Sequence, residues 1–320
     1  MEIGLFTNCF HDKPWEEICR IANENGISIV EAGAGALNGK SHCNPAELLK
    51  DAEALKKFRN TAKRYNIEIR ELSCMGNYLH PNKNIADGLL ADLEAAMELA
   101  SKLGITIINT FAGCPGAGEG ALYPNWIALT YPPEFAEYSK WQWEKKIIPF
   151  WNNMVRKARM KGIRFGFEMH TGDSVYNPET LLRLREETGA EEISCKFDPT
   201  HLFWQGIDPI ICIKKLGSAI ISVHAQDAEI NKQVMECNGC FTTRDYSDVK
   251  NRPWNLRLVG YGHPEAFWRD MISALRREGY DGSINIEHQD ACISLNEGIN
   301  KASDFLKKII FHQKSVVIKY

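Results

Sequence analysis

The sequence predicts a single (β/α)8 barrel, an α/β fold in which eight parallel strands alternate with eight helices. Eight short β-rich runs alternate strictly with longer helical patterns, and a parallel return between strands requires such a crossover. The 320-residue chain is 44% hydrophobic, which is enough for one large core. Four of the expected strands end in carboxylate or imidazole side chains, and barrel enzymes gather their catalytic groups at the carboxyl ends of the strands.

The strands are expected, in chain order, at residues 3–7, 27–32, 67–74, 106–111, 164–169, 193–197, 220–224 and 283–287. Helical patterns are expected at about 14–25, 45–65, 86–103, 134–161, 178–187, 208–216, 264–278 and 295–310. In the helix at 86–103, apolar residues recur at spacings of three and four and predict one buried stripe. Helices are expected to stop at glycines, which adopt the left-handed C-cap conformation, at Gly26, Gly104, Gly162 and Gly279.

An open, doubly wound sheet is the alternative arrangement for the same alternation of elements. Such a sheet normally carries a glycine-rich phosphate-binding turn after its first strand. The corresponding segment here is Thr7-Asn8-Cys9-Phe10-His11, which contains no glycine. The barrel is therefore the preferred prediction.

The barrel is expected to span residues 1–310, followed at 311–320 by an apolar tail with two lysines that packs on the barrel or on a neighbouring subunit. Two connections, 112–133 and 228–262, are longer than the scaffold needs and are interpreted as lids or binding loops. Both follow a strand, so both are expected on the catalytic face. The second carries arginines that either bind a substrate phosphate or are solvated surface charges, namely Arg244, Arg252 and Arg257.

Composition narrows the class of protein. The formal net charge of -3 argues against binding to nucleic acid or to anionic membranes. No apolar stretch approaches the length needed to cross a bilayer, and the first residues lack the basic region of a signal peptide. The ten cysteines are scattered, and Cys237 and Cys240 are interpreted as loop cysteines rather than as a zinc or redox pair. These features favour a reducing, cytoplasmic compartment.

The polar strand ends predict a metal centre. When a strand is buried on both faces, charged groups at its end are costly unless they meet an opposite charge. One such end is more often a helix cap or half of an ion pair, but four in consecutive units indicate a shared divalent ion. The expected ligands are Glu168, Asp198, His224 and Glu287. Three carboxylates and one imidazole favour Mn²⁺, with Mg²⁺, Co²⁺ or Zn²⁺ as alternatives, and no organic cofactor is expected.

The motifs around these ligands resemble those of the xylose isomerase-like barrel superfamily, in particular its sugar phosphate isomerase/epimerase group. The matching segments are Phe167-Glu168-Met169-His170, Phe197-Asp198-Pro199-Thr200-His201, Val223-His224-Ala225-Gln226-Asp227 and Ile286-Glu287-His288-Gln289-Asp290. The resemblance implies that Glu168 and Glu287 flank the reacting carbon of the substrate as acid and base. Two departures concern substrate contacts rather than the metal, since Gln226 replaces the usual lysine and Gln289 replaces the usual acid.

The predicted function is a divalent-metal-dependent isomerase or epimerase of a monosaccharide or sugar derivative. A bound cation stabilises an enediolate as a Lewis acid, while one carboxylate removes the α-proton and another returns it. The alternative on the same scaffold is a metal-dependent lyase or dehydratase of a keto-sugar or inosose. A third interpretation, an abasic-site endonuclease with three metals, lacks an expected ligand pair in segment 228–262. The expected partner is therefore a small sugar, without nucleic acid or membrane, and a homo-oligomer is left open.

Several further residues are candidates for contacts to the substrate. His201 is assigned to a substrate hydroxyl or carbonyl oxygen, with a core hydrogen bond as the alternative. His170 shares the face of Glu168 by strand alternation, whereas His288 is expected to be structural. Asp227 is expected to orient His224 or to contact substrate. The remaining strand-end candidates are either pocket wall or structural, and they are Glu31, Asn109 and His80.

Overall fold

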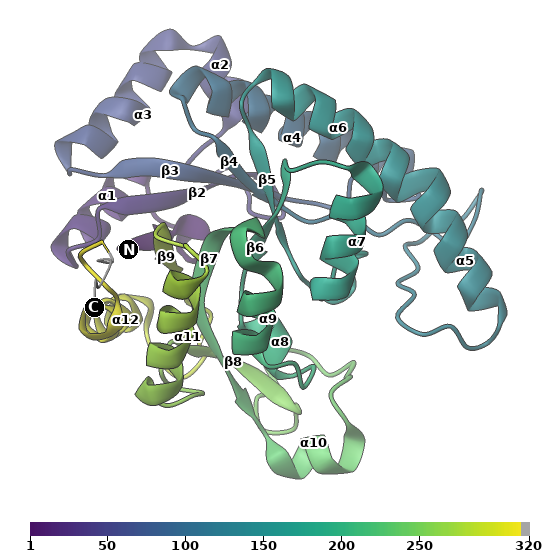
Figure 1. Ribbon diagram of the computed structural model, residues 1–320. Coiled ribbons are helices and arrows are strands. Elements are labelled where there is room, and N and C mark those ends of the chain that lie inside the picture. Colours follow the sequence, from purple (N-terminus) through teal and green to yellow (C-terminus); the bar gives the residue numbers. More distant parts are fainter. Residues whose placement is uncertain (315–320) are drawn as a thin grey trace, which may run out of the picture.

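The structure, a computed structural model that describes residues 1–314, contains a closed barrel of eight parallel strands (Figure 1). Consecutive strands pair in register from β1 to β7, and β9 closes the barrel between β7 and β1. The barrel strands are β1 (Glu2–Phe6), β2 (Ile29–Ala36), β3 (Glu68–Met75), β4 (Ile107–Thr110), β5 (Arg164–Glu168), β6 (Ile193–Phe197), β7 (Ile220–Ile230) and β9 (Ser283–Ile286). The predicted (β/α)8 barrel is therefore confirmed.

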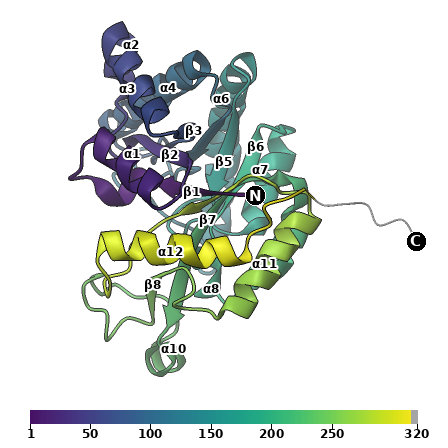
Figure 2. The same ribbon diagram turned by 90° about the vertical axis from the view of Figure 1, so that its left-hand side faces the viewer.

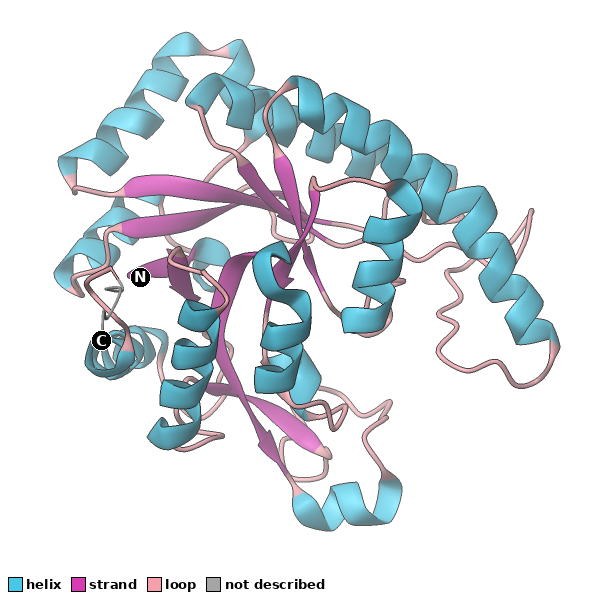
Figure 3. Cartoon of the chain, in the orientation of Figure 1, coloured by secondary structure: helices cyan, strands magenta, loops and turns pink. Residues whose placement is uncertain are grey.

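Helices surround the strands, as the colouring by secondary structure makes plain (Figure 3). They are α1 (Trp15–Glu24), α2 (Pro45–Lys50), α3 (Ala52–Arg64), α4 (Lys83–Leu103), α5 (Glu134–Gln142), α6 (Ile148–Met160), α7 (Pro178–Thr188), α8 (Thr200–Phe203), α9 (Pro209–Leu216), α10 (Lys232–Asn238), α11 (Glu265–Arg277) and α12 (Leu295–Ile309). Three short turns complete the set: η1 (Thr7–Phe10), the π-helical η2 (Trp143–Ile147) and η3 (Gly217–Ala219). The predicted glycine stops are confirmed, because Gly26, Gly104, Gly162 and Gly279 all have positive φ.

Two long helices expected from the sequence are interrupted. The first breaks at Asp51, whose side chain accepts hydrogen bonds from Glu53 N and Ala54 N and so caps α3. The second passes through the π-helical turn η2 before α6 begins. Pro149 follows this turn and has no backbone N–H, so a regular i→i−4 hydrogen bond is lost there.

The prediction that the seventh strand ends at His224 was wrong. Strand β7 continues to Ile230, and β8 (Trp254–Leu258) pairs with this extension in antiparallel register. The 228–262 connection is thus a β-hairpin that carries α10, and it projects from the barrel in both ribbon views (Figures 1 and 2). Residues 111–133, by contrast, contain neither helix nor strand.

The interior of the barrel contains polar groups, although such interiors are usually filled by branched apolar side chains. Glu71 is buried and accepts hydrogen bonds from Asn109 Nδ2 at 2.7 Å and from Asn285 Nδ2 at 3.3 Å. Glycines on the neighbouring strands make room for the two amides. A Cβ atom at Gly166 would lie 2.4 Å from Asn109 Oδ1, and one at Gly4 would lie 1.9 Å from Asn285 Oδ1.

Among residues 1–314, no helix combines the length and the hydrophobicity needed to cross a membrane. The predicted tail, 311–320, is described only at its start, and residues 315–320 lie outside the described part of the chain. At that start, the carbonyl oxygen of Phe311 accepts hydrogen bonds from the Met1 amino group at 2.9 Å and from Arg276 at 3.0 Å. Residue 311 therefore lies beside the first strand.

Candidate metal centre

A cavity of about 470 Å³ lies at the carboxyl ends of the barrel strands. Its lining contains two glutamates, two histidines, four side-chain amides and seven apolar or aromatic side chains. The lining residues are Phe6, Asn8, Leu37, Asn38, Met75, Phe111, Glu168, His170, His201, Gln226, Tyr246, Trp254, Leu256, Glu287 and Gln289.

The four predicted metal ligands meet at one side of this cavity, where Glu168 and Glu287 belong to the lining and Asp198 and His224 lie buried beside them. Glu168 ends β5, His224 lies within β7, and Asp198 and Glu287 directly follow β6 and β9. His224 Nδ1 lies 2.6 Å from Glu287 Oε2, 3.5 Å from Asp198 Oδ2 and 4.0 Å from Glu168 Oε2. All four side chains are buried. The four consecutive strand ends thus bring three carboxylates and one imidazole to one point.

The donor atoms at this point fit a divalent cation. Among the described residues, Glu168 Oε2, Asp198 Oδ2 and His224 Nδ1 are buried and have no partner with hydrogen-bond geometry, although His224 Nδ1 lies only 2.6 Å from Glu287 Oε2. Buried polar atoms are normally paired, so a cluster of atoms that lack hydrogen-bond geometry is suited to coordinating a cation. The ligand atoms of Asp198, His224 and Glu287 lie within 4.8 Å of one another, which is compact enough for one ion.

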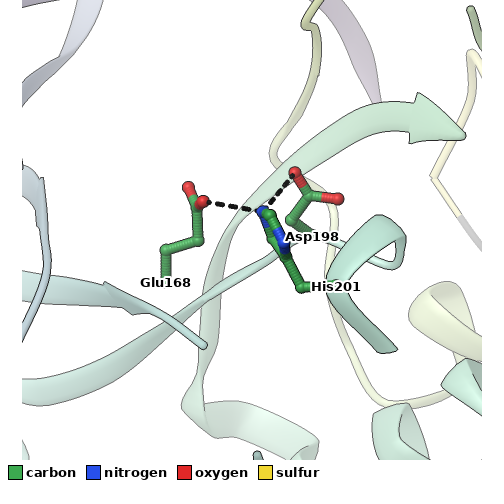
Figure 4. Close-up of side chains that lie close together, drawn as sticks. All are labelled: Glu168, Asp198 and His201. Carbon is green, nitrogen blue, oxygen red and sulfur yellow. Dashed lines mark ion pairs between the residues drawn. The ribbon is translucent and has the colours of Figure 1, made fainter. Parts of the chain in front are cut away.

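His201 joins the cluster from α8 (Figure 4). Its Nε2 atom lies 3.3 Å from Glu168 Oε1 and 4.0 Å from Asp198 Oδ2. The His170 ring packs against the His201 ring with 4.2 Å between centroids, and both rings line the cavity. The structure therefore places these two predicted substrate contacts beside the metal ligands.

The environment shifts the pKa values of the two glutamates in opposite directions. Burial opposes ionisation of Glu168, but the hydrogen bond to His201 and the charge of Lys196 outweigh it and lower the pKa to about 2. Burial raises the pKa of Glu287, with a smaller contribution from neighbouring carboxylates, although His224 opposes the shift. Burial also lowers the pKa of His170 to about 4, so this ring is neutral near pH 7.

Behind His224, a buried ion pair fixes the imidazole. Glu31 Oε2 lies 3.0 Å from His224 Nε2, and Glu31 Oε1 pairs with Lys196 Nζ. All three side chains are fully buried. A carboxylate that accepts the Nε2 proton leaves the Nδ1 lone pair free for a metal, as is usual for metal-ligating histidines. Lys196 Nζ also lies 3.9 Å from Glu168 Oε2, so it offsets part of the negative charge of the cluster.

Three other predicted candidates lie outside the cavity lining. The carboxylate of Asp227 is fully buried and accepts hydrogen bonds from the backbone N–H groups of Gly260, Gly262 and His263 and from Trp268 Nε1. It therefore holds the turn after β8 rather than facing His224 or a substrate. Asn109 belongs to the polar interior of the barrel, and His80 Nδ1 accepts from Asn82 N at the start of α4.

Sequence reasoning missed several residues of the site. Lys196 lies in an apolar strand, where an unpaired lysine would be very costly, and this was a usable signal for a buried acidic partner. Tyr246 and Trp254 also belong to the cavity lining. The segment Trp254-Asn255-Leu256-Arg257-Leu258 alternates apolar and polar residues, which is typical of a half-buried strand. Asn8 and Asn38 had no sequence signal.

The three arginines of the 228–262 segment contact other side chains of the protein. Arg257 pairs with Asp290 at 2.8 Å and with Glu229 at 2.7 Å. The guanidinium of Arg252 lies over the Tyr246 ring at 3.9 Å and is almost fully buried. Arg244 pairs with Asp248 on the surface. None of the three belongs to the cavity lining.

Comparison with known proteins identifies the family. The chain matches the family described as xylose isomerase-like TIM barrel over residues 15–309. It is 34% identical over 313 residues to the uncharacterized protein YfiH of Bacillus subtilis (strain 168), which covers 97% of this chain and 99% of that protein. It is 26% identical over 160 residues to the inosose dehydratase of Geobacillus thermodenitrificans (strain NG80-2), covering 49% of this chain and 51% of that protein.

Solved structures share the fold at low sequence identity. The probable 3-DHS dehydratase AsbF from Bacillus anthracis has a TM-score of 0.67 and 17% identity, with 96% of this chain and 99% of that chain covered. D-psicose 3-epimerase from Clostridium cellulolyticum H10 has a TM-score of 0.60 and 14% identity, with 97% and 99% covered. A xylose isomerase-like TIM barrel protein from Mycobacterium smegmatis in complex with magnesium has a TM-score of 0.63 and 15% identity, with 96% of each chain covered. The chain therefore belongs to the xylose isomerase-like TIM barrel family.

Proposed function

We propose that this protein is a divalent-metal-dependent isomerase or epimerase of a monosaccharide or sugar derivative. The observation that carries the proposal is the convergence of Glu168, Asp198, His224 and Glu287 beside one cavity, which Glu168 and Glu287 line. These four residues would hold the ion, with Mn²⁺ expected first and Mg²⁺, Co²⁺ or Zn²⁺ as alternatives. Such an ion supplies a Lewis acid, which makes a proton next to a carbonyl group more acidic.

The residues around the cavity account for the proton transfers. Glu168 and Glu287 both line the cavity and come from strands on either side of β6 and β7. One carboxylate removes the proton from the carbon next to the carbonyl, and the other returns a proton to the opposite face or to the adjacent carbon. His201, 3.3 Å from Glu168, binds a substrate oxygen and keeps that carboxylate oriented.

A dehydratase of a keto-sugar or inosose is the second candidate. The named relatives include an inosose dehydratase and a probable 3-DHS dehydratase as well as an epimerase. His201 favours this candidate, because burial is outweighed by Glu168 and Asp198, which raise its pKa, so that this imidazole could protonate a leaving hydroxyl group. Both candidates begin with the same removal of an α-proton, and they differ only in the second step, which is reprotonation in one case and loss of water in the other.

The test incubates the manganese-loaded protein in D₂O with ketohexoses and with inosose. The paramagnetic ion is then removed, and the sugars are analysed by proton NMR. New deuterated epimers or isomers support the first candidate, and loss of water supports the second. Glu168→Gln and Glu287→Gln should each lower turnover by at least about 10²-fold, because acid–base catalysis typically contributes about 10² to 10⁴. Glu53→Gln, at an exposed residue of α3, is the matched control. Substantial activity in either site variant overturns the assignment of the two glutamates. Three bound metals per chain instead of one would favour the endonuclease interpretation.

A further inference from the structure

The β7–β8 hairpin supplies part of the cavity lining, namely Tyr246, Trp254 and Leu256. Trp254 begins β8 and is only 7% exposed. Tyr246, by contrast, lies in a segment that contains neither helix nor strand, and it is 61% exposed. A side chain on an exposed, irregular segment is mobile unless other groups hold it. Tyr246 can therefore form a defined part of the cavity only if a neighbour fixes it.

Arg252 makes the contacts that fix Tyr246. Its guanidinium lies over the Tyr246 ring at 3.9 Å from the centroid and over the Trp254 ring at 4.8 Å. The Nη1 atom of Arg252 also donates a hydrogen bond to the backbone oxygen of Arg244 at 2.8 Å. The irregular segment is thus held at two places, through its backbone at Arg244 and through the ring of Tyr246.

These contacts explain why Arg252 is buried. Arg244 and Arg257 each pair with a carboxylate, whereas Arg252, which is 2% exposed, forms no ion pair with any residue among 1–314, and its buried Nε atom has no hydrogen-bond partner there. A buried cation without a counter-ion is costly. Aromatic faces compensate for part of this cost, most effectively when water is excluded. A planar guanidinium can also stack on rings in a way that an ammonium group cannot.

The stack continues into the barrel. Trp254 packs face to face on Trp204, with 4.7 Å between the ring centroids and 7° between the ring planes. Trp204 is buried and is the C-cap residue of α8, the helix that contains His201. We call this set of side chains the Arg252 column. In order of contact, it consists of Tyr246, Arg252, Trp254 and Trp204. The column therefore connects the exposed hairpin segment to the helix that carries His201.

We propose that Arg252 is a positioning residue that holds Tyr246 and Trp254 as a preformed wall of the cavity, and that this wall sets the affinity for the substrate without taking part in the proton transfers. The inference deepens the proposed function and rests on it. A wall that is ordered before binding spares the substrate the entropy cost of ordering it. Immobilising one flexible side chain on binding typically weakens affinity by about two- to tenfold.

The test measures kcat and KM of the manganese-loaded protein for D-fructose, D-tagatose and D-psicose, and the Kd of each sugar by titration calorimetry. Arg252→Met should raise KM and Kd by about fivefold and leave kcat within about twofold of the wild-type value, because only binding is affected. Arg252→Lys keeps the charge but not the planar stack, so it should weaken binding to the same extent. Lys250→Met removes an exposed charge from the same hairpin and is the matched control.

A double-variant cycle tests whether Arg252 acts through Tyr246. Tyr246→Ala, at an exposed position, should weaken binding at least as much as Arg252→Met. The double variant Tyr246→Ala, Arg252→Met should bind about as weakly as Tyr246→Ala alone, since the group that Arg252 holds is already absent. Effects that multiply instead overturn the positioning role. If Arg252→Met does not fold, Arg252→Lys takes its place in the cycle.

The remaining outcomes separate this inference from the proposed function. A wild-type KM in Arg252→Met, or wild-type affinity in Arg252→Lys or Tyr246→Ala, overturns the inference even if the protein isomerises a ketohexose. Full affinity in Arg252→Lys alone would show that the positive charge matters and not the stack. Weaker binding by the variants of a sugar that the wild type binds but does not convert supports the inference and contradicts the isomerase and epimerase assignment. Absence of binding by all three sugars, or an equal loss in Lys250→Met, overturns the role of the wall.

Discussion

Lys196→Met should strongly destabilise the metal-free protein. The lysine is fully buried, and its ammonium group pairs with Glu31 inside the barrel. Methionine has a similar length and no charge, so the substitution removes the charge with little change in volume. The result is a buried carboxylate that has lost its counter-ion.

The structure sets the size of this effect. Breaking a buried ion pair by removing one partner typically costs about 3–5 kcal/mol. Glu31 keeps three other donors, Ser73 Oγ, His224 Nε2 and Asn285 Nδ2, so we expect the lower end, about 3 kcal/mol. Domains have a total free energy of unfolding of only about 5–15 kcal/mol. The variant should therefore fold but with a large part of its stability lost.

Equilibrium unfolding in urea, after treatment with a chelator, measures this loss. With a slope of about 3 kcal/mol/M, the transition midpoint should fall by about 1 M urea. The double variant Glu31→Gln, Lys196→Met should recover at least half of the loss, because no unpaired charge stays buried. Lys56→Met, at a mostly exposed lysine of α3, should leave the midpoint unchanged. The reasoning fails if the single variant unfolds at the wild-type midpoint, or if the double variant is less stable than the single one.

The metal cluster, the barrel interior and the Arg257 ion pair each give a further prediction. When free Mn²⁺ is kept at about 100 times its dissociation constant, removal of the metal should lower the free energy of unfolding by about 2.7 kcal/mol. The thermal midpoint should fall and be restored by added Mn²⁺. An unchanged midpoint argues against a metal centre. Gly166→Ala should destabilise the fold by about 1–3 kcal/mol, since its Cβ would lie 2.4 Å from Asn109 Oδ1, whereas Gly88→Ala, with no atom within 4 Å of its Cβ position, should not. Burial opposes ionisation of Asp290, but Arg257 and two backbone N–H groups lower its pKa below the usual value. The stabilising effect of the Asp290 carboxylate should thus be complete above about pH 4 and be lost as the pH falls through the folded-state pKa. Asp290→Asn should therefore have a lower urea midpoint than the wild type at pH 7, and the two midpoints should converge in acid. A difference that persists in acid contradicts the ion-pair explanation.

The sequence was sufficient to predict the barrel and the place where four polar strand ends meet. Both depend on local patterns, namely the alternation of strands and helices and the burial of the strand that precedes each ligand. The β7–β8 hairpin was missed because the extension of β7 beyond His224 carries polar residues, Gln226 and Asp227, that a buried parallel strand would not contain. In the structure, Gln226 lines the cavity and Asp227 binds the turn after β8.

The roles of individual polar residues were harder to predict than their positions. Asp227 and His201 each follow a strand-end motif, yet one holds a backbone turn and the other lies in the cavity. Sequence spacing gives the distance of a residue from a strand end but not the direction of its side chain once the strand twists or pairs anew. Lys196 and Glu31 are 165 residues apart, and only the closure of the barrel brings them together.

Strand β7 also suggests how proteins with this scaffold acquire new substrates. Within a few residues it carries His224 at the metal cluster, Gln226 in the cavity wall and Asp227 at the base of the hairpin. The hairpin that bears Trp254 is tied to the barrel through Asp227, while the metal cluster is fixed from below by Glu31 and Lys196. The hairpin and the metal cluster are thus held in place by different residues. An exchange of the hairpin between relatives, either in evolution or in the laboratory, could alter substrate choice without rebuilding the centre that carries out the reaction.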